Sequence, residues 1–148
     1  MPWLIWIYRI LFLPALILLL PYYLLRMVRR GGYLRDFPQR LGFGKILTAP
    51  SNPRIWIQAV SVGEILAIES LVRQLQEKKY EVVITTTTST GYQLALEKYQ
   101  KQVRFTGLFP LDFLPFTYLA WHRIRPTLAI LMESELWPEH LWQAKRRK

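Results

Sequence analysis

The chain has 148 residues, of which 51% are hydrophobic, a formal net charge of +10 and no cysteine. Its length suits one ordinary domain with an appendage, and the absence of thiols excludes disulfides, thiol nucleophiles and thiolate metal sites. Residues 54–144 carry nine basic and nine acidic side chains, so the net positive charge comes from the first 53 residues and the last four. This distribution favours an anionic membrane surface or a phosphorylated lipid over nucleic acid as the partner.

An apolar segment begins the chain. Residues 3–25 contain a single charge, Arg9, and are long enough to cross the hydrocarbon core of a membrane as a helix. The segment is followed by three arginines, Arg26, Arg29 and Arg30. Charges in this position do not fit a cleavable signal peptide, and they place the downstream chain in the cytoplasm by the positive-inside rule. We therefore predict a membrane anchor with a basic flank over residues 1–30.

The mode of insertion stays open at this stage. Pro14 and Pro21 are expected to kink the helix, and Arg9 lies close enough to one end to snorkel towards the lipid headgroups. Both a spanning and a monotopic anchor are compatible with this pattern.

Glycine and proline interrupt residues 31–53 seven times, which predicts a connector with short helical pieces. From residue 54 onward, apolar runs typical of buried strands alternate with amphipathic repeats typical of helices. We expect strands over 55–60, 81–86, 103–108 and 127–132, helices over 65–77, 90–98 and 116–124, and a helix start at Pro138. This alternation predicts an α/β fold with a parallel sheet.

Ligands of parallel α/β sheets bind beyond the carboxyl ends of the strands. The segments at those positions are residues 61–64, 87–91, 110–112 and 133–138. Two isolated histidines, His122 and His140, form no spaced metal motif. The sequence therefore directs attention to acids and hydroxyls at one edge of the sheet.

The first of these segments carries a glutamate. The stretch QAVSVGE over residues 58–64 ends a strand, allows close approach at Gly63 and places Glu64 in the first turn of a helix. Glu64 either serves chemistry at the ligand edge or complements the positive end of its helix, which stabilises a helix by up to about 1 kcal/mol. Spacing does not decide between these two roles.

Three further groups of residues could serve ligand binding. Two of them also have a purely structural or solvent-exposed interpretation. The hydroxyl-rich stretch TTTTSTG over residues 85–91 either offers a helix start to an anion or supplies a cap through Ser89 or Thr90. Arg40 either grips phosphate or is a solvated arginine near lipid. Two acids just past a hydrophobic strand are harder to explain by solvation, namely Glu133 and Glu135.

In chain order, the segments RLG, AVSVGE, TTTTSTG and MESELWP resemble the signature segments of the transferases of 3-deoxy-D-manno-octulosonic acid (Kdo), which also carry an anchor in front of them. The resemblance covers essentially the whole chain with matching order and spacing. It departs at Gln58, where a histidine is expected, at Ser89, where proline is frequent, and at residues 107–112, which replace a tighter turn. The chain also ends at Lys148, where the family continues with a linker and a second domain.

The resemblance implies that residues 54–148 form the Rossmann-like, acceptor-binding amino-terminal domain of a GT-B glycosyltransferase, truncated before the donor-binding domain. It implies inverting transfer of Kdo from CMP-Kdo to the lipid A precursor, in lipopolysaccharide core synthesis at the cytoplasmic face of the inner (plasma) membrane. No cofactor and no bound metal are implied.

The resemblance also assigns roles to single residues. Glu64 matches the general base, while Glu133 and Glu135 match a second acidic motif that orients the acceptor or tunes Glu64. The residues expected to bind or support the acceptor are Arg40, Ser61, Gly63, Thr87, Thr88, Thr90 and Gly91.

Two functions stay open from the sequence. The chain is either the acceptor half of an active enzyme, whose donor half comes from a split partner, a neighbouring reading frame or the remainder of an incomplete record, or a non-catalytic, membrane-anchored lipid-binding remnant. In both cases we expect no transfer by this chain alone, because it lacks the donor-binding domain.

Overall fold

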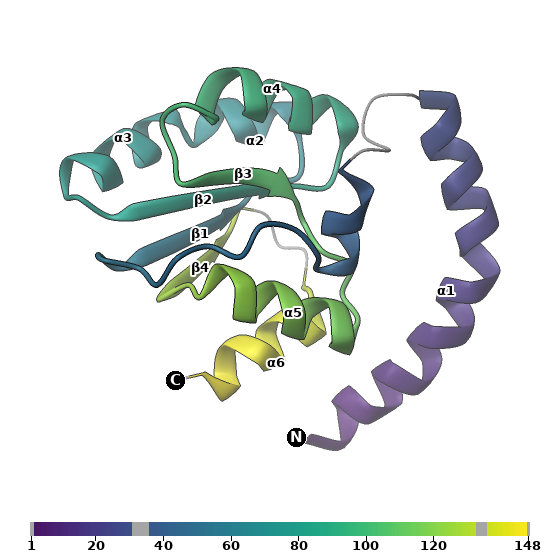
Figure 1. Ribbon diagram of the computed structural model, residues 1–148. Helices are drawn as coiled ribbons and strands as arrows, with labels where there is room; N and C mark the ends of the chain where they lie inside the picture. Colours follow the sequence, from purple (N-terminus) through teal and green to yellow (C-terminus); the bar gives the residue numbers. More distant parts are fainter. Residues whose placement is uncertain (1, 31–35, 133–135, 148) are drawn as a thin grey trace.

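The computed structural model describes residues 2–30, 36–132 and 136–147 (Figure 1). Four parallel strands form one sheet with the order β3-β2-β1-β4. Their bounds are β1 Arg54–Gln58, β2 Glu81–Thr86, β3 Phe105–Leu108 and β4 Leu128–Leu131. This order is that of the first four strands of the Rossmann fold, so the predicted α/β class with a parallel sheet is confirmed.

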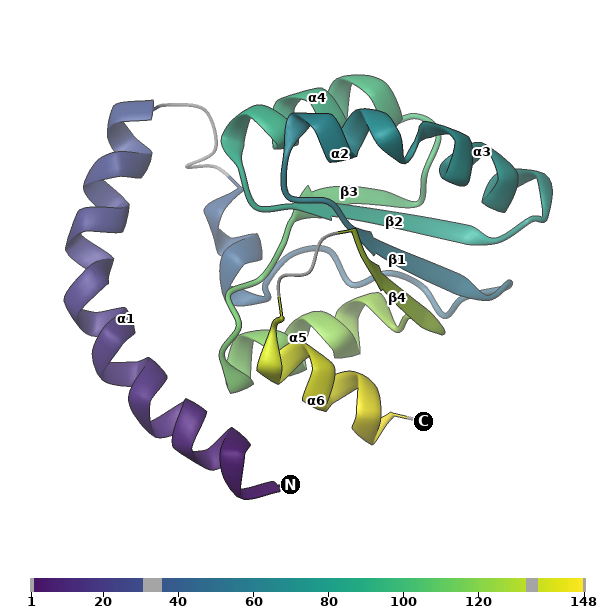
Figure 2. The same cartoon turned by 180° about the vertical axis from the view of Figure 1, so that it is seen from behind.

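Helices cover both faces of the sheet (Figures 1 and 2). One face carries α2 Val62–Ala67, α3 Glu69–Glu77 and α4 Ser89–Tyr99, and the other carries α5 Leu114–Ile124 and α6 Pro138–Arg146. The single helix expected over residues 65–77 is divided into α2 and α3, because the backbone at Ile68 departs from helical geometry with ψ of −3°. Ile68 is itself fully buried, so the bend keeps both helices on the core.

Strand β1 is buried along its whole length, as expected for an inner strand of a sheet covered on both faces. Ile55 and Ile57 pack with α2 to α4, while Trp56 packs on the other side. The Trp56 ring lies 5.3 Å from that of Trp121 and 5.7 Å from that of Phe109, measured between centroids. The two hydrophobic cores thus meet at β1, which fixes the position of its carboxyl end.

The connector between the anchor and the sheet contains one short helical piece in its described part, the 3-10 helix η1 Phe37–Leu41. It ends at Gly42, which has a φ of 80°. A Cβ atom at Gly42 would lie 2.3 Å from the carbonyl oxygen of Phe116, so both the backbone conformation and the contact with α5 require glycine. The connector is therefore packed against the domain.

The apolar segment at the start of the chain forms helix α1, Pro2–Arg30, which continues through Pro14 and Pro21 and curves along one side of the domain (Figures 1 and 2). Among the described residues, α1 is the helix that is long and apolar enough to cross a membrane. The expectation that Arg9 snorkels is wrong for this structure, because its guanidinium pairs with the carboxylate of Glu139 at 2.9 Å. That carboxylate is fully buried, so Arg9 is held by the domain.

Replacement of Arg54 tests how the amino ends of the strands are held together. Its buried guanidinium pairs with Glu81 of β2 at 2.5 Å and donates to the carbonyls of Thr48 and Ile124. We expect Arg54→Ala to lower the free energy of unfolding by about 3 kcal/mol, because a partly buried carboxylate and two carbonyls lose their partner. Lys98→Ala is the matched control, since it breaks an exposed pair with Glu69 and should leave the free energy of unfolding nearly unchanged.

Urea unfolding in detergent micelles, followed by tryptophan fluorescence, measures both variants. Equal stability of Arg54→Ala and the parent chain would contradict this role for Arg54.

Candidate functional site

The carboxyl ends of β1 and β2 are joined at the carbonyl of Val60. The hydroxyls of Thr86 and Thr88 donate to this oxygen at 3.2 and 2.9 Å, and the amide of Ala59 donates to the carbonyl of Thr85 at 3.0 Å. These bonds bring the turn that carries Glu64 next to the hydroxyl-rich turn after β2. Two of the segments singled out in the sequence therefore lie side by side at the ligand edge of the sheet.

Glu64 is held by a capping box at the start of α2. Its carboxylate accepts hydrogen bonds from the amide of Val60 at 2.8 Å and from the amide and hydroxyl of Ser61 at 3.1 and 2.6 Å. The Ser61 hydroxyl in turn accepts from the amide of Glu64 at 3.3 Å. Glu64 thus has the helix-capping role, and it does so at the carboxyl edge with its side chain half-exposed. Its role as a base stays a prediction.

The helix after the hydroxyl-rich turn is capped by Thr88, one residue before the pair expected from the sequence. Thr88 Oγ1 accepts from the amide of Gly91 at 3.1 Å, and α4 begins at Ser89. The cap falls on Thr88 because the same hydroxyl also donates to Val60, a contact that only the folded sheet creates. The proposal that Ser89 or Thr90 caps α4 is therefore wrong, and Thr90 is left exposed.

The two glycines of the site have different surroundings. Gly91 is buried, and a Cβ atom there would lie 2.7 Å from Thr88 Oγ1 and 2.8 Å from Thr86 Oγ1. A Cβ atom at Gly63 would have Ser61 Oγ as its nearest neighbour, at 3.9 Å. Gly91 is thus required by packing inside the protein, whereas Gly63 has room for a side chain unless a ligand occupies that space.

Arg40 lies between the ends of β2 and β3. It is 4% exposed, and its guanidinium donates to the carbonyl of Phe109 at 2.9 Å and to the carbonyl of Thr87. The interpretation of Arg40 as a solvated arginine is therefore wrong. These contacts make it a link between the connector and the hydroxyl-rich turn, and its binding of an acceptor anion stays a prediction.

The second acidic motif, Glu133 and Glu135, lies outside the described residues. The residues on either side of it are described: the amide of Met132 donates to the carbonyl of Gln58 at 3.0 Å, and α6 begins at Pro138 as expected. The chain therefore leaves β4 beside the end of β1, which is the end that carries Glu64.

One buried acid of this edge, Asp112, has a structural role that the sequence did not predict. Asp112 is 2% exposed, and its carboxylate accepts from the amides of Glu139 and His140 at 3.1 and 2.9 Å, which caps the start of α6. Burial raises the pKa of Asp112, while hydrogen bonds from Tyr8 and from the α6 backbone oppose this rise. The available signal was Trp137, which has no side-chain acceptor at a position where helices normally have one.

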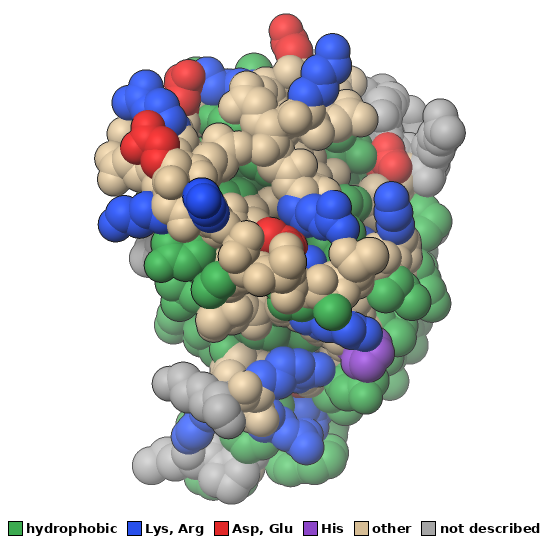
Figure 3. Space-filling model, turned by 60° about the vertical axis from the view of Figure 1, so that its left-hand side comes forward, with side chains coloured by type: hydrophobic (Ala, Val, Ile, Leu, Met, Phe, Trp, Pro, Cys, Tyr) green, Lys and Arg blue, Asp and Glu red, His purple; other side chains and the backbone are tan. Residues whose placement is uncertain are grey.

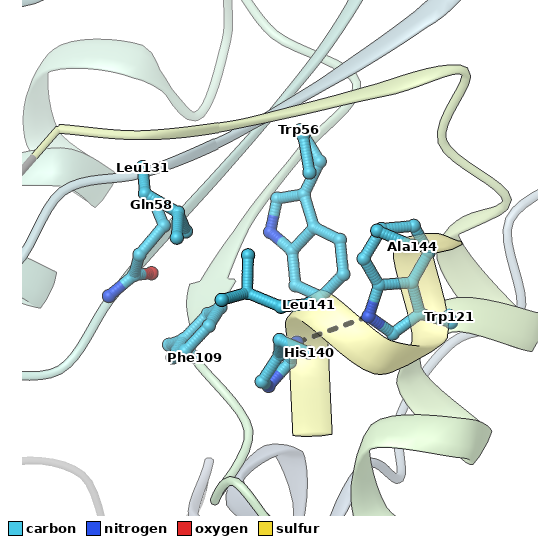
Figure 4. A pocket seen from close by; sticks show the side chains of 9 residues that line it. Trp56, Gln58, Phe109, Trp121, Leu131, His140, Leu141 and Ala144 are labelled. Carbon is cyan, nitrogen blue, oxygen red and sulfur yellow. Dashed lines mark hydrogen bonds between the residues drawn. The ribbon is translucent and has the colours of Figure 1, made fainter. Parts of the chain in front are cut away.

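A small cavity of about 60 Å³ lies between the sheet and α6, lined by Trp56, Gln58 and His140 among others (Figure 4). His140 Nδ1 accepts from Trp121 Nε1 at 3.1 Å, and burial lowers the pKa of His140 to about 3. The imidazole is therefore neutral and belongs to the core. In the part of the chain that the structure describes, no group of three His, Cys, Asp or Glu residues could hold a metal ion.

Comparison with known proteins gives a consistent picture. Residues 35–148 match the family model described as 3-deoxy-D-manno-octulosonic-acid transferase (kdotransferase). The chain is 37% identical over 122 residues to the 3-deoxy-D-manno-octulosonic acid transferase of Haemophilus influenzae, which covers 78% of this chain and 27% of that protein. It is 35% identical over 129 residues to the protein of the same name from Bordetella pertussis, which covers 81% of this chain and 29% of that protein.

A relative from Arabidopsis thaliana, described as a probable mitochondrial 3-deoxy-D-manno-octulosonic acid transferase, is 33% identical over 124 residues, with 80% of this chain and 27% of that protein covered. The chain thus spans less than a third of the length of the curated relatives it matches. No solved structure matches it.

The two glycines can be tested as a pair. We expect Gly91→Ala to destabilise the fold by about 1–3 kcal/mol, because the new methyl group forces apart two hydroxyls that are both bonded to Val60. Gly63→Ala should leave stability within about 0.5 kcal/mol of the parent chain. Urea unfolding measures the stability of both variants. A destabilised Gly63→Ala with an unaffected Gly91→Ala would show that packing requires glycine at position 63 and not at position 91.

The buried, neutral state of His140 predicts that the free energy of unfolding depends on pH. Its pKa in the folded state, about 3, lies below the ordinary value of about 6.5, so the unfolded chain takes up the proton first as the pH falls. The stability that His140 contributes is complete above about pH 6.5 and is lost progressively towards pH 3. Between pH 7 and pH 5 the loss should reach about 2 kcal/mol.

His140→Gln is the control, because an amide can accept from Trp121 and donate to Pro110 but does not titrate. Asp112 acts in the opposite direction through its raised pKa, and this contribution cancels in the difference between the two proteins. Identical pH profiles of the unfolding free energy would show that His140 is not buried in its neutral form.

Proposed function

This chain belongs to the Kdo transferase family, and on that premise we propose that it is the acceptor-binding half of a glycosyltransferase that moves Kdo from CMP-Kdo to the lipid A precursor. The observation that carries the proposal is the junction at Val60, where the Glu64 turn and the start of α4 meet at the carboxyl edge of the sheet. Because the chain covers less than a third of its relatives, the activity of the whole enzyme is part of the proposal.

In the proposed reaction, a hydroxyl of the acceptor attacks the anomeric carbon of Kdo from the face opposite to the CMP group. The new carbon–oxygen bond forms as the bond to the phosphate of CMP breaks, and the hydroxyl proton passes to Glu64. A carboxylate fixed by the amides of Val60 and Ser61 suits this role, since a general base must be held within hydrogen-bond reach of the proton. We propose that the reaction uses no metal and no cofactor, as the resemblance to the Kdo transferases implies.

We propose that the acceptor lipid binds along the same edge through its anionic groups. The start of α4 offers backbone amides and the exposed hydroxyl of Thr90 at a positive helix end. Thr87 and Thr88 form this turn, in which Thr88 caps α4. Arg40 holds the turn in place by donating a hydrogen bond to the carbonyl of Thr87. Gly91 lets α4 pack closely against Val60.

The other residues of the site complete this proposal. Ser61 fixes Glu64, and Gly63 leaves space beside it. Glu133 and Glu135, on the segment between β4 and α6, are assigned to orienting the acceptor. We propose that catalysis takes place at the cytoplasmic face of the inner membrane, with the donor bound by a second domain.

Replacement of Glu64 tests the assignment of the base. In Glu64→Gln the capping box survives, because glutamine at this position can also accept from the amides, but basicity is lost. When the chain is fused to the donor-binding part of the Haemophilus influenzae relative, we expect transfer from CMP-Kdo to the tetra-acylated precursor to fall by about 10² or more. Binding of precursor vesicles should persist.

Glu69→Gln is the matched control, since Glu69 is an exposed acid at the start of α3, and it should transfer at the parent rate. The 148-residue chain without a donor half should show no turnover. Near-normal turnover of Glu64→Gln would return Glu64 to its helix-capping role. If no donor half restores transfer although precursor is bound, the chain is a non-catalytic, membrane-anchored lipid-binding module.

A further inference from the structure

Helix α1 is fastened to the domain near its amino end by two buried carboxylates. The Tyr8 hydroxyl lies 2.8 Å from both the carboxylate and the backbone oxygen of Asp112. Arg9 donates through Nε and Nη2 to the two carboxylate oxygens of Glu139, each at 2.9 Å. We refer to these four residues as the clamp. Removal of Arg9 would leave the Glu139 carboxylate, which is fully buried, without its cation.

Apolar contacts on the same side of α1 support the clamp. Ile5 is buried, and Phe12 stacks on Phe113 at 5.5 Å between ring centroids. Ile5, Tyr8, Arg9 and Phe12 recur at three and four residues, so they lie on one side of the helix. The amino-terminal half of α1 is thus packed against the start of α5 and α6.

The carboxyl end of α1 is also tied to the same domain. Only six residues separate Arg30, where α1 ends, from Phe37, where η1 begins. Arg40 in η1 is bonded to the carbonyls of Thr87 and Phe109. Six residues and their flanking bonds span at most about 25 Å when fully extended.

These two attachments exclude a membrane span. Along the helix axis, Arg9 and Arg30 are about 32 Å apart, which is close to the thickness of the hydrocarbon core, about 30 Å. If α1 crossed the bilayer, Arg9 would lie near one membrane surface while η1 and the domain lay at the other. Glu139 would then be unable to reach Arg9, because the charged domain cannot enter the hydrocarbon.

The remaining surface of α1 is apolar and exposed, as at Trp6, Ile10, Leu18 and Leu19. Two grooves of about 450 and 400 Å³ run on either side of the clamp, bounded by α1 and by the starts of α5 and α6. Hydrocarbon is the occupant that fits these surfaces. The arginines at the end of α1, Arg26, Arg29 and Arg30, add the charge that attracts anionic lipid headgroups.

We propose that α1 lies along the surface of one leaflet, clamped to the domain, and does not cross the bilayer. The side of the domain turned away from α1 carries interspersed charged side chains, as a surface in water does (Figure 3). In both cartoon views the strands point towards α1, so the bilayer faces the carboxyl edge with Glu64 and Thr87 (Figures 1 and 2). This inference rests on the proposed membrane location, and it lets a lipid headgroup meet the site without leaving its leaflet.

Single cysteines test the position of α1 directly, because the chain has none of its own. Trp3→Cys reports on the amino end of α1 and Gln76→Cys on the domain. With a membrane-impermeant maleimide we expect neither to be labelled in intact cells and both to be labelled after solubilisation in detergent. Labelling of either one alone in intact cells would overturn the proposal, since the amino end of α1 and the domain would then lie on opposite sides of the membrane.

Labelling of both cysteines in intact cells has a different meaning. It would contradict the cytoplasmic location in the proposed function, and it would still support a helix that stays on one side of the membrane with its domain. Failure of the proposed function and failure of the clamp are therefore distinguishable.

A cross-link tests the clamp in isolated membranes. Leu4 and Leu141 line the same groove, so a cysteine pair at these positions should be joined by a bismaleimide cross-linker that spans the groove. The pair Leu18→Cys and Leu141→Cys is the control, because Leu18 is 79% exposed and lies beyond the docked half of α1. Arg9→Glu should reduce the Leu4–Leu141 cross-link at least tenfold through repulsion from Glu139, whereas Arg104→Glu, at a remote exposed site, should not.

An undiminished cross-link in Arg9→Glu would overturn the clamp. So would a cross-link that forms in detergent micelles but not in membranes.

Discussion

The carboxylate of Asp112 accepts hydrogen bonds from the amides of Glu139 and His140 and from the hydroxyl of Tyr8. One buried side chain thus joins the loop after β3, the start of α6 and helix α1, which are far apart in the sequence. Because a buried carboxylate is costly unless it is fully bonded, the packing of each of these three elements stabilises the other two. The orientation of α1 and the position of the start of α6 both depend on this arrangement.

A second junction, at the carbonyl of Val60, organises the proposed site. Two threonine hydroxyls from the β2 turn reach this oxygen, and the adjacent amide is held by Glu64. The hydroxyls of Thr86 and Thr88 and the carboxylate of Glu64 all have structural tasks in this corner, and the same bonds fix the position that a base and an anion-binding helix start would need. The structural role of Glu64 is compatible with the proposed chemical one, because preorganisation requires catalytic groups that are already held in place.

The fold relates the position of α1 to that of the candidate site. The parallel strands point towards α1, and the clamp fixes which side of that helix meets the domain (Figure 1). A lipid substrate presents its polar headgroup at the membrane surface. An enzyme that acts on such a headgroup can reach it directly when the carboxyl edge of its sheet lies at the level of the headgroups. The chain belongs to the Kdo transferase family, and the proposed arrangement of lipid, helix and sheet is compatible with its fold.

The sequence by itself determined the local features of this protein. Hydrophobic periodicity located every strand of the sheet to within a few residues, and the run of residues 3–25 identified α1, because these signals depend on neighbours along the chain. The cap at Thr88, the burial of Arg40, the role of Asp112 and the pairing of Arg9 with Glu139 came only from the tertiary structure. Each of these depends on a partner between 27 and 130 positions away, and a contact of that kind leaves no periodic signal in the chain.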